Sequence, residues 1–365
     1  MKIGIVTLLD EKNYGNRWQN YALNELLHSI NIEPENLYFW IRNNNRKCLR
    51  EMIKRMCPIK LAYFLHAVSA YQIKNSAIMR RVIKFAHFTQ KHMGSHLILA
   101  NTYEELCNRF HSEGYDYFAA GSDQVWNPYY AASPIYFLQF VNKEKRLSFM
   151  ASFGSDKIPR EQVSVYEKWM REMSYISVRE PSGADIVRLL TGKSADIFFD
   201  PTLLLEKEKW ILLSYKPKGI TLPERYAVIF MFDCNPEVLR EVCSGWNIHL
   251  LILNDENNKK LYSLDPAEML YVLNHAEIVF TDSFHIMALS IRLNKQFYIF
   301  KRTGFEYMFG RLESTLVRLG ITQCIYPQNG DIIMHPIRDK DYEEINYQLD
   351  MEKIRFLETV CNITK

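Results

Sequence analysis

Short apolar runs alternate along this chain with longer segments of helical periodicity, and this alternation limits the folds that the chain can adopt. Runs of roughly four to eight β-branched, aromatic and aliphatic residues are typical of buried strands. Strand, helix and strand in succession predict a parallel sheet with helices on its faces. The first series comprises expected strands at residues 2–8, 37–41, 115–120, 146–152, 175–179 and 196–199, and expected helices at 17–30, 161–173 and 182–190.

A second series of the same kind follows a stretch that is rich in charge, Pro and Gly. Two successive series predict an α/β protein with two Rossmann-like, doubly wound domains and a ligand cleft between them. A length of 365 residues is consistent with two domains of ordinary size. The second series comprises expected strands at residues 226–232, 248–253, 278–281 and 296–300, with helices from Pro236 and at 266–274 and 284–291.

The domain boundaries follow from these two series. We expect an N-terminal domain at residues 1–205, a linker region at 206–225 and a C-terminal domain at 226–340. Residues 341–365 are expected to form a final amphipathic helix, for which packing back on the first domain is one option.

Residues 41–93 interrupt the first series with a strong excess of positive charge. They hold twelve basic residues and one acidic residue, a net charge of +11. Because the whole chain has a formal net charge of +3, the remaining residues carry −8. One interpretation is a basic, helical insert that contacts anionic membrane lipid, a pyrophosphate-linked acceptor or an acidic polymer. The other is a solvated helical face that acidic residues balance in three dimensions. The small overall charge gives no sign of a nucleic-acid partner.

Several other classes of protein are not indicated. The seven cysteines are scattered and never spaced as CxxC, which argues against a disulfide framework or a zinc site. The opening apolar run ends at Asp10, too early for a secretory signal, and no apolar stretch has the length of a membrane span. Phosphate-loop, dinucleotide, metalloprotease and hydrolase-elbow motifs are missing. We expect a cytoplasmic protein without a bound metal or cofactor, with peripheral contact at the inner membrane face as an option.

Ligands of doubly wound sheets bind beyond the carboxyl ends of the strands, so the residues after each strand are the first candidates. Gly121, Ser122 and Asp123 follow the expected strand at 115–120. Gly121 permits a tight turn, and Asp123 can orient a partner or act as a general acid or base. A simple capped turn is the competing interpretation.

Arg179 occupies the second polar junction, at the end of a strand and beside a helix that begins near Pro181. Its planar guanidinium suits a carboxylate or phosphate, and a helix N-terminus also favours anions. An ion pair with Glu180 or another acid is the alternative, and the sequence leaves both open.

Asp282, Ser283 and His285 form the third junction, after the strand at 278–281. Asp282 or Ser283 can cap the helix that follows, which places His285 in the first turn. A histidine at such a position can exchange a proton near neutral pH. A structural histidine that is hydrogen-bonded to a neighbouring loop is the alternative.

Six segments of the chain are NYGNRWQNYAL (13–23), GSDQVWNP (121–128), SFG (152–154), SVREPSG (177–183), DPTLLL (200–205) and TDSFHIMALS (281–290). Taken together and in this order, they resemble the polysaccharide pyruvyl transferase family. The resemblance implies two Rossmann-like domains similar to the glycosyltransferase B architecture. It also implies transfer of the enolpyruvyl unit of phosphoenolpyruvate, the donor substrate, to a sugar or lipid-linked saccharide of an exopolysaccharide or cell-surface polymer.

The resemblance also suggests roles for individual residues. His285 and Asp123 are the expected catalytic acid–base groups. Well-studied members have Arg-Leu-His at the third junction, where this chain has Ser283-Phe284-His285. The remaining expected contacts are with the donor at Arg179, Ser283, Ser122 and Gly121, and with the acceptor at Trp126 and Asn16.

The replaced arginine leaves three readings open. In the first, Arg179 and another cation, such as Arg292 or Lys301, supply the positive charge that Ser283 lacks. In the second, the donor is a different molecule. In the third, the chain is a non-catalytic relative that binds glycans. A glycosyltransferase that uses a nucleotide-sugar donor is the alternative enzyme class.

Overall fold

The computed structural model describes residues 1–8, 10, 12–41, 76–110, 114–130, 133–232, 236–302, 309–326 and 336–365. The described residues divide into two compact units. Unit 1 holds those up to residue 41, those at 89–204 and those at 352–365, and unit 2 holds 76–88 and 205–351 with the gaps given above.

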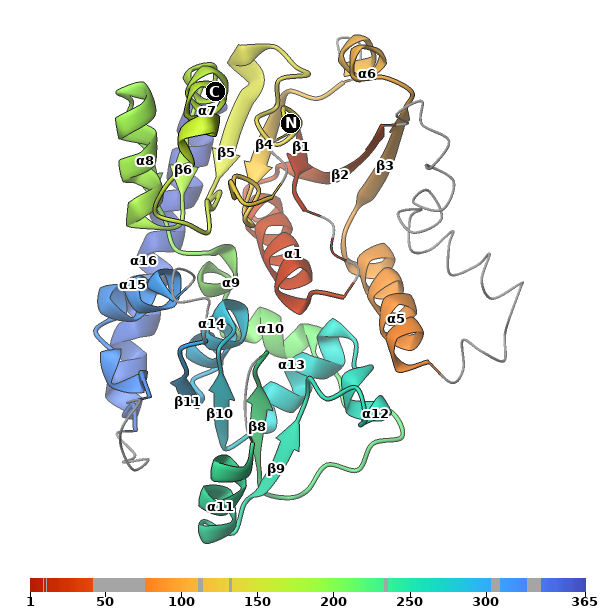
Figure 1. Ribbon diagram of the computed structural model, residues 1–365, viewed down its shortest axis with the longest axis vertical. Helices are drawn as coiled ribbons and strands as arrows, with labels where there is room; N and C mark the ends of the chain where they lie inside the picture. Colours follow the sequence, from red (N-terminus) through yellow and green to blue (C-terminus); the bar gives the residue numbers. More distant parts are fainter. Residues whose placement is uncertain are drawn as a thin grey trace. The chain divides into compact units, whose positions relative to one another are not determined.

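Unit 1 contains a parallel sheet of five strands in the order β3-β2-β1-β4-β5 (Figure 1). A short parallel pair, β6-β7, continues it through bridges from Leu147 to Tyr175 and from Ala151 to Val178. The strands are β1 (Lys2–Val6), β2 (Glu33–Ile41), β3 (Ser95–Ala100), β4 (Tyr117–Gly121), β5 (Arg146–Phe149), β6 (Ser177–Val178) and β7 (Asp196–Ile197). The helices are α1 (Tyr14–His28), α6 (Tyr103–Phe110), α7 (Val163–Arg171), α8 (Pro181–Thr191) and α9 (Pro201–Leu204).

The strand order places a switch point at the centre of the unit 1 sheet. The chain runs outward from β1 to β2 and β3 on one side, and from β4 to β5 on the other. Ile3 and Ile5 of β1 and Ala119 of β4 are fully buried, as expected for strands covered on both faces. The carboxyl ends of β1 and β4 therefore mark the expected binding edge of this unit.

Unit 2 contains a parallel sheet of four strands in the order β11-β10-β8-β9 (Figure 1). Its switch point lies between β8 and β10, which pair directly. The strands are β8 (Tyr226–Phe230), β9 (His249–Ile252), β10 (Ile278–Thr281) and β11 (Gln296–Ile299). The helices are α10 (Lys207–Leu213), α11 (Glu237–Gly245), α12 (Lys259–Tyr262), α13 (Pro266–His275), α14 (Phe284–Arg292) and α15 (Gly310–Leu319).

Two further helices contain residues of both units. Residues 77–88 of α5 (Ala77–His92) belong to unit 2, and residues 339–351 of α16 (Asp339–Ile363) do so too. In unit 1, Phe356 of α16 packs edge-on against Phe149 (ring centroids 5.7 Å apart) and Phe198 (5.3 Å). The last part of the predicted C-terminal helix thus has aromatic contacts within unit 1.

The parallel sheets confirm the predicted α/β class, and every predicted strand lies at an observed one, most of them shorter than predicted. Three elements of unit 1, β3, α6 and α9, were not predicted. The first two follow the basic stretch that interrupts the pattern, and α9 is a helix of only four residues. Helix α10 lies inside the stretch predicted as a linker. The domain bounds at residues 205 and 225 stay predictions.

The basic stretch is described only from residue 76 onward, so its predicted part at 42–75 lies outside the described residues. In α5, Lys84 forms an ion pair with Glu268 (2.6 Å), and the buried Arg81 lies over the ring of Tyr262 (4.8 Å). These two charges have partners within unit 2, which favours the interpretation of a face balanced by other residues. Contact with a membrane through residues 41–93 stays a prediction.

Candidate functional site

Asp123 lies at the binding edge of unit 1, just beyond β4. Asn13 caps α1 by accepting a hydrogen bond from the backbone N–H of Asn16 (3.2 Å). This cap fixes the first turn, from which Nδ2 of Asn16 donates to Oδ2 of Asp123 (3.1 Å) and to the carbonyl oxygen of Leu8 (2.6 Å). One amide therefore joins the end of β1 to the candidate catalytic carboxylate. Asn16 itself is fully buried, so the prediction that it contacts the acceptor is wrong, and its observed role is to hold Asp123.

Gln19 is a second connecting residue, and sequence reasoning did not single it out. Its Oε1 accepts from both the backbone N–H (3.1 Å) and the Oγ (2.6 Å) of Ser122, and its Nε2 donates to Asn20 Oδ1 (2.6 Å) and Thr7 Oγ1 (3.3 Å). All four of these residues are buried. Gln19 lies one helical turn after Asn16, and this spacing on one face of α1 is the signal that could have revealed it.

Replacing Gln19 by Leu is expected to lower the free energy of unfolding by about 1–3 kcal/mol, because two buried donors of Ser122 lose their acceptor. Urea titration of the full chain measures this loss. The matched control is Gln90→Leu on the exposed face of α5, which is expected to change stability by less than about 0.5 kcal/mol. Equal stability of both variants would show that Gln19 does not hold the turn.

Gly121 and Ser122 serve the turn rather than a donor. A Cβ at position 121 would lie 2.1 Å from the carbonyl oxygen of Phe149, and the φ of 155° disfavours other residues. Ser122 is fully buried and bonded to Gln19, so the prediction that its hydroxyl contacts the donor is wrong.

Trp126 is a core residue, and its predicted role as a platform for the acceptor is wrong. The side chain is fully buried, its Nε1 donates to the carbonyl oxygen of Tyr136 (2.9 Å), and its ring stacks on Phe137 with centroids 5.5 Å apart. A sugar ring needs an exposed aromatic face, which Trp126 does not have. The sequence showed an indole beside a polar turn but not the face to which it points.

Arg179 is buried among carboxylates at the same edge of unit 1. Its Nε donates to Glu180 (2.9 Å) and its Nη1 to Asp200 (2.5 Å). Burial lowers the pKa of Arg179, but the carboxylates of Glu180, Asp200 and Asp123 outweigh it and raise the pKa above the ordinary arginine value. Of the two open readings, these contacts favour the ion pair over a donor clamp.

The binding edge of unit 2 presents a different set of groups. Thr281 Oγ1 donates to the carbonyl oxygen of Phe230 (2.8 Å), which ties the ends of β10 and β8 together. Ser283 occupies the N-cap position of α14 but makes no side-chain capping bond, contrary to the expected cap. His285 lies in the first turn of α14 as predicted, and both it and Ser283 are partly exposed.

Asp282 does not cap α14 but anchors two groups. Both of its carboxylate oxygens accept from the backbone N–H of Phe232 (3.2 and 3.0 Å), and Oδ2 also accepts from Nε of Arg302 (3.0 Å). Arg302 follows the end of β11 by three residues, so the rule of inspecting strand ends could have found it.

The two cations named as substitutes for the missing arginine have other contacts. Arg292 is buried and donates to the carbonyl oxygen of Leu205 (2.8 Å), to Asn346 (2.9 Å) and to Asp350 (2.6 Å). It is therefore a structural residue of unit 2, and the prediction that it compensates is wrong. Lys301 is exposed and lies over the ring of Phe309 (4.9 Å), and its role stays a prediction.

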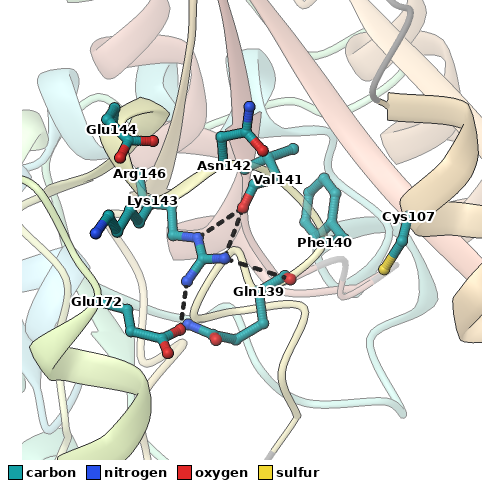
Figure 2. Close-up of a pocket in the computed structure, with 9 residues that line it drawn as sticks. All are labelled: Cys107, Gln139, Phe140, Val141, Asn142, Lys143, Glu144, Arg146 and Glu172. Atoms are coloured by element: carbon teal, nitrogen blue, oxygen red, sulfur yellow. Dashed lines mark hydrogen bonds and ion pairs between the residues drawn. The ribbon is translucent and has the colours of Figure 1, made fainter.

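A pocket of about 420 Å³ lies at the opposite end of the unit 1 sheet, where β5 begins (Figure 2). Arg146 occupies its centre and donates twice to the carbonyl oxygen of Val141 (2.8 and 2.6 Å) and once to Glu172 (2.7 Å). These bonds hold the loop before β5, so the arginine acts structurally. The lining residues are Cys107, Gln139, Phe140, Val141, Asn142, Lys143, Glu144, Arg146 and Glu172, none of them a predicted site residue.

In the described part of the chain, no three His, Cys, Asp or Glu side chains gather in a way that would hold a metal ion. No helix of that part combines the length and the apolar composition needed to cross a bilayer.

The chain is similar to several solved structures. A protein assigned as a UDP-N-acetylglucosamine 2-epimerase from Listeria monocytogenes is 9% identical with a TM-score of 0.50, over 99% of this chain and 96% of that one. UDP-GlcNAc 2-epimerase from Methanocaldococcus jannaschii is 11% identical with a TM-score of 0.47, over 96% and 93%. Glycosyltransferase VinC, solved with DTDP, is 12% identical with a TM-score of 0.41, over 100% and 98%.

The likeness to the Listeria protein bears on the fold alone, and the chain has the two-domain, Rossmann-like and glycosyltransferase B-like fold that its sequence predicted. No curated protein sequence matches the chain. The model of one family, described as polysaccharide pyruvyl transferase, matches residues 13–303 and so includes every predicted site residue. The chain therefore belongs to the polysaccharide pyruvyl transferase family.

Proposed function

We propose that this protein transfers the enolpyruvyl unit of phosphoenolpyruvate to a sugar of a polysaccharide precursor and forms a pyruvate ketal. Membership of the family supports a transferase of this class. The donor, the acceptor and the ketal product are parts of the proposal. The observation that carries it is the partly exposed His285 in the first turn of α14, at the switch point of the unit 2 sheet.

The proposed reaction needs an acid, a base and cations. A proton is added to C3 of the enolpyruvyl group while a sugar hydroxyl adds to C2 and loses its own proton. The C2–O bond to phosphate then breaks, and phosphate leaves with the bonding electrons. A second hydroxyl of the sugar adds to the C2 cation that remains, loses its proton to a base and so closes the ring. Positioned acid–base groups contribute to each proton transfer, and cations stabilise the phosphate as it leaves.

His285 is proposed to supply the proton to C3 and to accept a proton from a hydroxyl. Asp123 is proposed to orient the acceptor hydroxyl or to take its proton, with its carboxylate held by Asn16 (3.1 Å). Arg179, Glu180 and Asp200 then have the supporting role of a buried ion cluster beside Asp123. This cluster holds more carboxylates than cations, which is unfavourable for an anionic donor but suits a neutral hydroxyl.

Incubation of the full chain with phosphoenolpyruvate and candidate sugar acceptors tests the proposal. We expect release of inorganic phosphate that depends on the acceptor, together with a product whose NMR spectrum contains the methyl signal of a pyruvate ketal. Stabilisation against heat by a nucleoside diphosphate but not by phosphoenolpyruvate would favour a nucleotide-sugar glycosyltransferase instead. Binding of a glycan without phosphate release would favour the non-catalytic relative.

A further inference from the structure

Residue 283, at the beginning of α14, is serine, whereas the Arg-Leu-His sequence of well-studied family members has arginine there. This end of α14 therefore has one positive charge fewer. An anionic donor bound beside His285 requires positive charge nearby. Arg292 cannot supply it, since the buried side chain is bonded to Leu205, Asn346 and Asp350. The positive charge must therefore come from another cation near the N-terminal end of α14.

Arg302 is such a cation. Its Nε donates to Asp282 (3.0 Å), the residue directly before Ser283, and its guanidinium lies 4.4 Å from the ring centroid of Phe232. Asp282 is itself fixed by the backbone N–H of Phe232 and is 1% exposed, whereas the side chain of Arg302 is 20% exposed. The carboxylate of Asp282, bonded to Nε, and the ring of Phe232, over which the guanidinium lies, together hold Arg302 in one place.

The charge around this turn also favours an anion. The guanidinium of Arg311 lies 5.8 Å from the ring centroid of Phe284, the first residue of α14. Two arginines and the carboxylate of Asp282 thus lie at the beginning of a nine-residue helix, whose dipole is positive at this end. In unit 1, by contrast, the single Arg179 has three carboxylates around it. The balance of charge is therefore more favourable for an oxyanion at the unit 2 edge than at the unit 1 edge.

We propose that Arg302, held by Asp282 and Phe232, binds the phosphate group of the donor and takes the place of the arginine that position 283 lacks. This inference rests on the proposed function. It moves the donor contact from the end of β10, where Ser283 lies, to the end of β11, where Arg302 lies. The bond to Asp282 is made by the N–H on Nε, and the side chain of Arg302 remains 20% exposed. A phosphate oxygen is a strong partner for such a group.

Calorimetric titration of the full chain with phosphoenolpyruvate, and separately with inorganic phosphate, tests the assignment. Arg302→Gln is expected to weaken the binding of both by about 10- to 100-fold, the size of one charge-assisted hydrogen bond. Arg302→Lys should recover part of the loss because it keeps the charge. The matched control is Arg338→Gln, at an exposed arginine of unit 2 paired with Asp341, and it should bind like the unaltered chain.

Each outcome bears on one proposal or on both. Binding by Arg302→Gln within about twofold of the unaltered chain, with its fold intact by circular dichroism, overturns the role of Arg302. If Arg302→Gln does not fold, the affinities of Arg302→Lys and Phe232→Leu for phosphoenolpyruvate and phosphate are compared with those of the unaltered chain. Unchanged affinity in both variants also overturns the role of Arg302. If the unaltered chain binds phosphoenolpyruvate but makes no ketal, the proposed function fails and the binding data alone judge Arg302. If the unaltered chain binds neither ligand, both proposals fail.

Discussion

Replacing His285 by Gln is expected to lower kcat for ketal formation by about 10²- to 10⁴-fold, the usual contribution of a positioned acid–base group. Glutamine keeps a similar size and a hydrogen-bonding end but cannot exchange a proton near neutral pH. The fold should persist, because His285 is partly exposed and the first turn of α14 depends on backbone bonds such as that from Met287 to Ser283 (3.0 Å). The binding of phosphoenolpyruvate should change far less than kcat.

His275→Gln is the matched control for this prediction. His275 is exposed at the end of α13 in the same unit, and its Nδ1 lies 2.9 Å from the carbonyl oxygen of Tyr271. Its replacement should leave the rate of phosphate release unchanged. A His285→Gln variant that turns over at a rate close to that of the control would remove the acid–base role and favour the structural reading of this histidine.

Replacing Arg179 by Met is expected to lower the free energy of unfolding by about 3–5 kcal/mol, because it leaves buried carboxylates without their counter-ion. Glu180 and Asp200 both accept hydrogen bonds from Arg179 and are almost fully buried. Ser152 also donates to Glu180 (2.7 Å), so the loss should spread to the loop after β5. Urea titration, with circular dichroism as the signal, measures the change.

Arg188→Met provides the comparison. Arg188 pairs with Asp185 on the exposed face of α8, and exposed ion pairs contribute less than about 1 kcal/mol. If Arg179→Met proved as stable as Arg188→Met but raised the KM for phosphoenolpyruvate, the donor-clamp reading of Arg179 would be right and the ion-cluster reading wrong. The two alternatives that the sequence left open are thus separated by one pair of variants.

The positions of the candidate residues at the strand ends were predictable, but their contacts were not. Strand ends can be read from local patterns, and this rule selected Asp123, Arg179 and His285, whose roles in catalysis and donor binding stay predictions. The same rule named Ser122 and Trp126, which are fully buried. Exposure depends on what the rest of the chain places over a side chain, and no local pattern records that.

The sequence by itself determined the α/β class, the two series of parallel strands and the family, because periodicity and short motifs depend on neighbouring residues. Only the tertiary structure decided which charges meet. Arg179 contacts Asp200, which is 21 residues away, and Arg302 contacts Asp282, which is 20 residues away. Parallel strands bring such distant residues to one edge of a sheet, so these two ion partners follow from strand order, whereas Glu180, the other partner of Arg179, is its neighbour in the sequence.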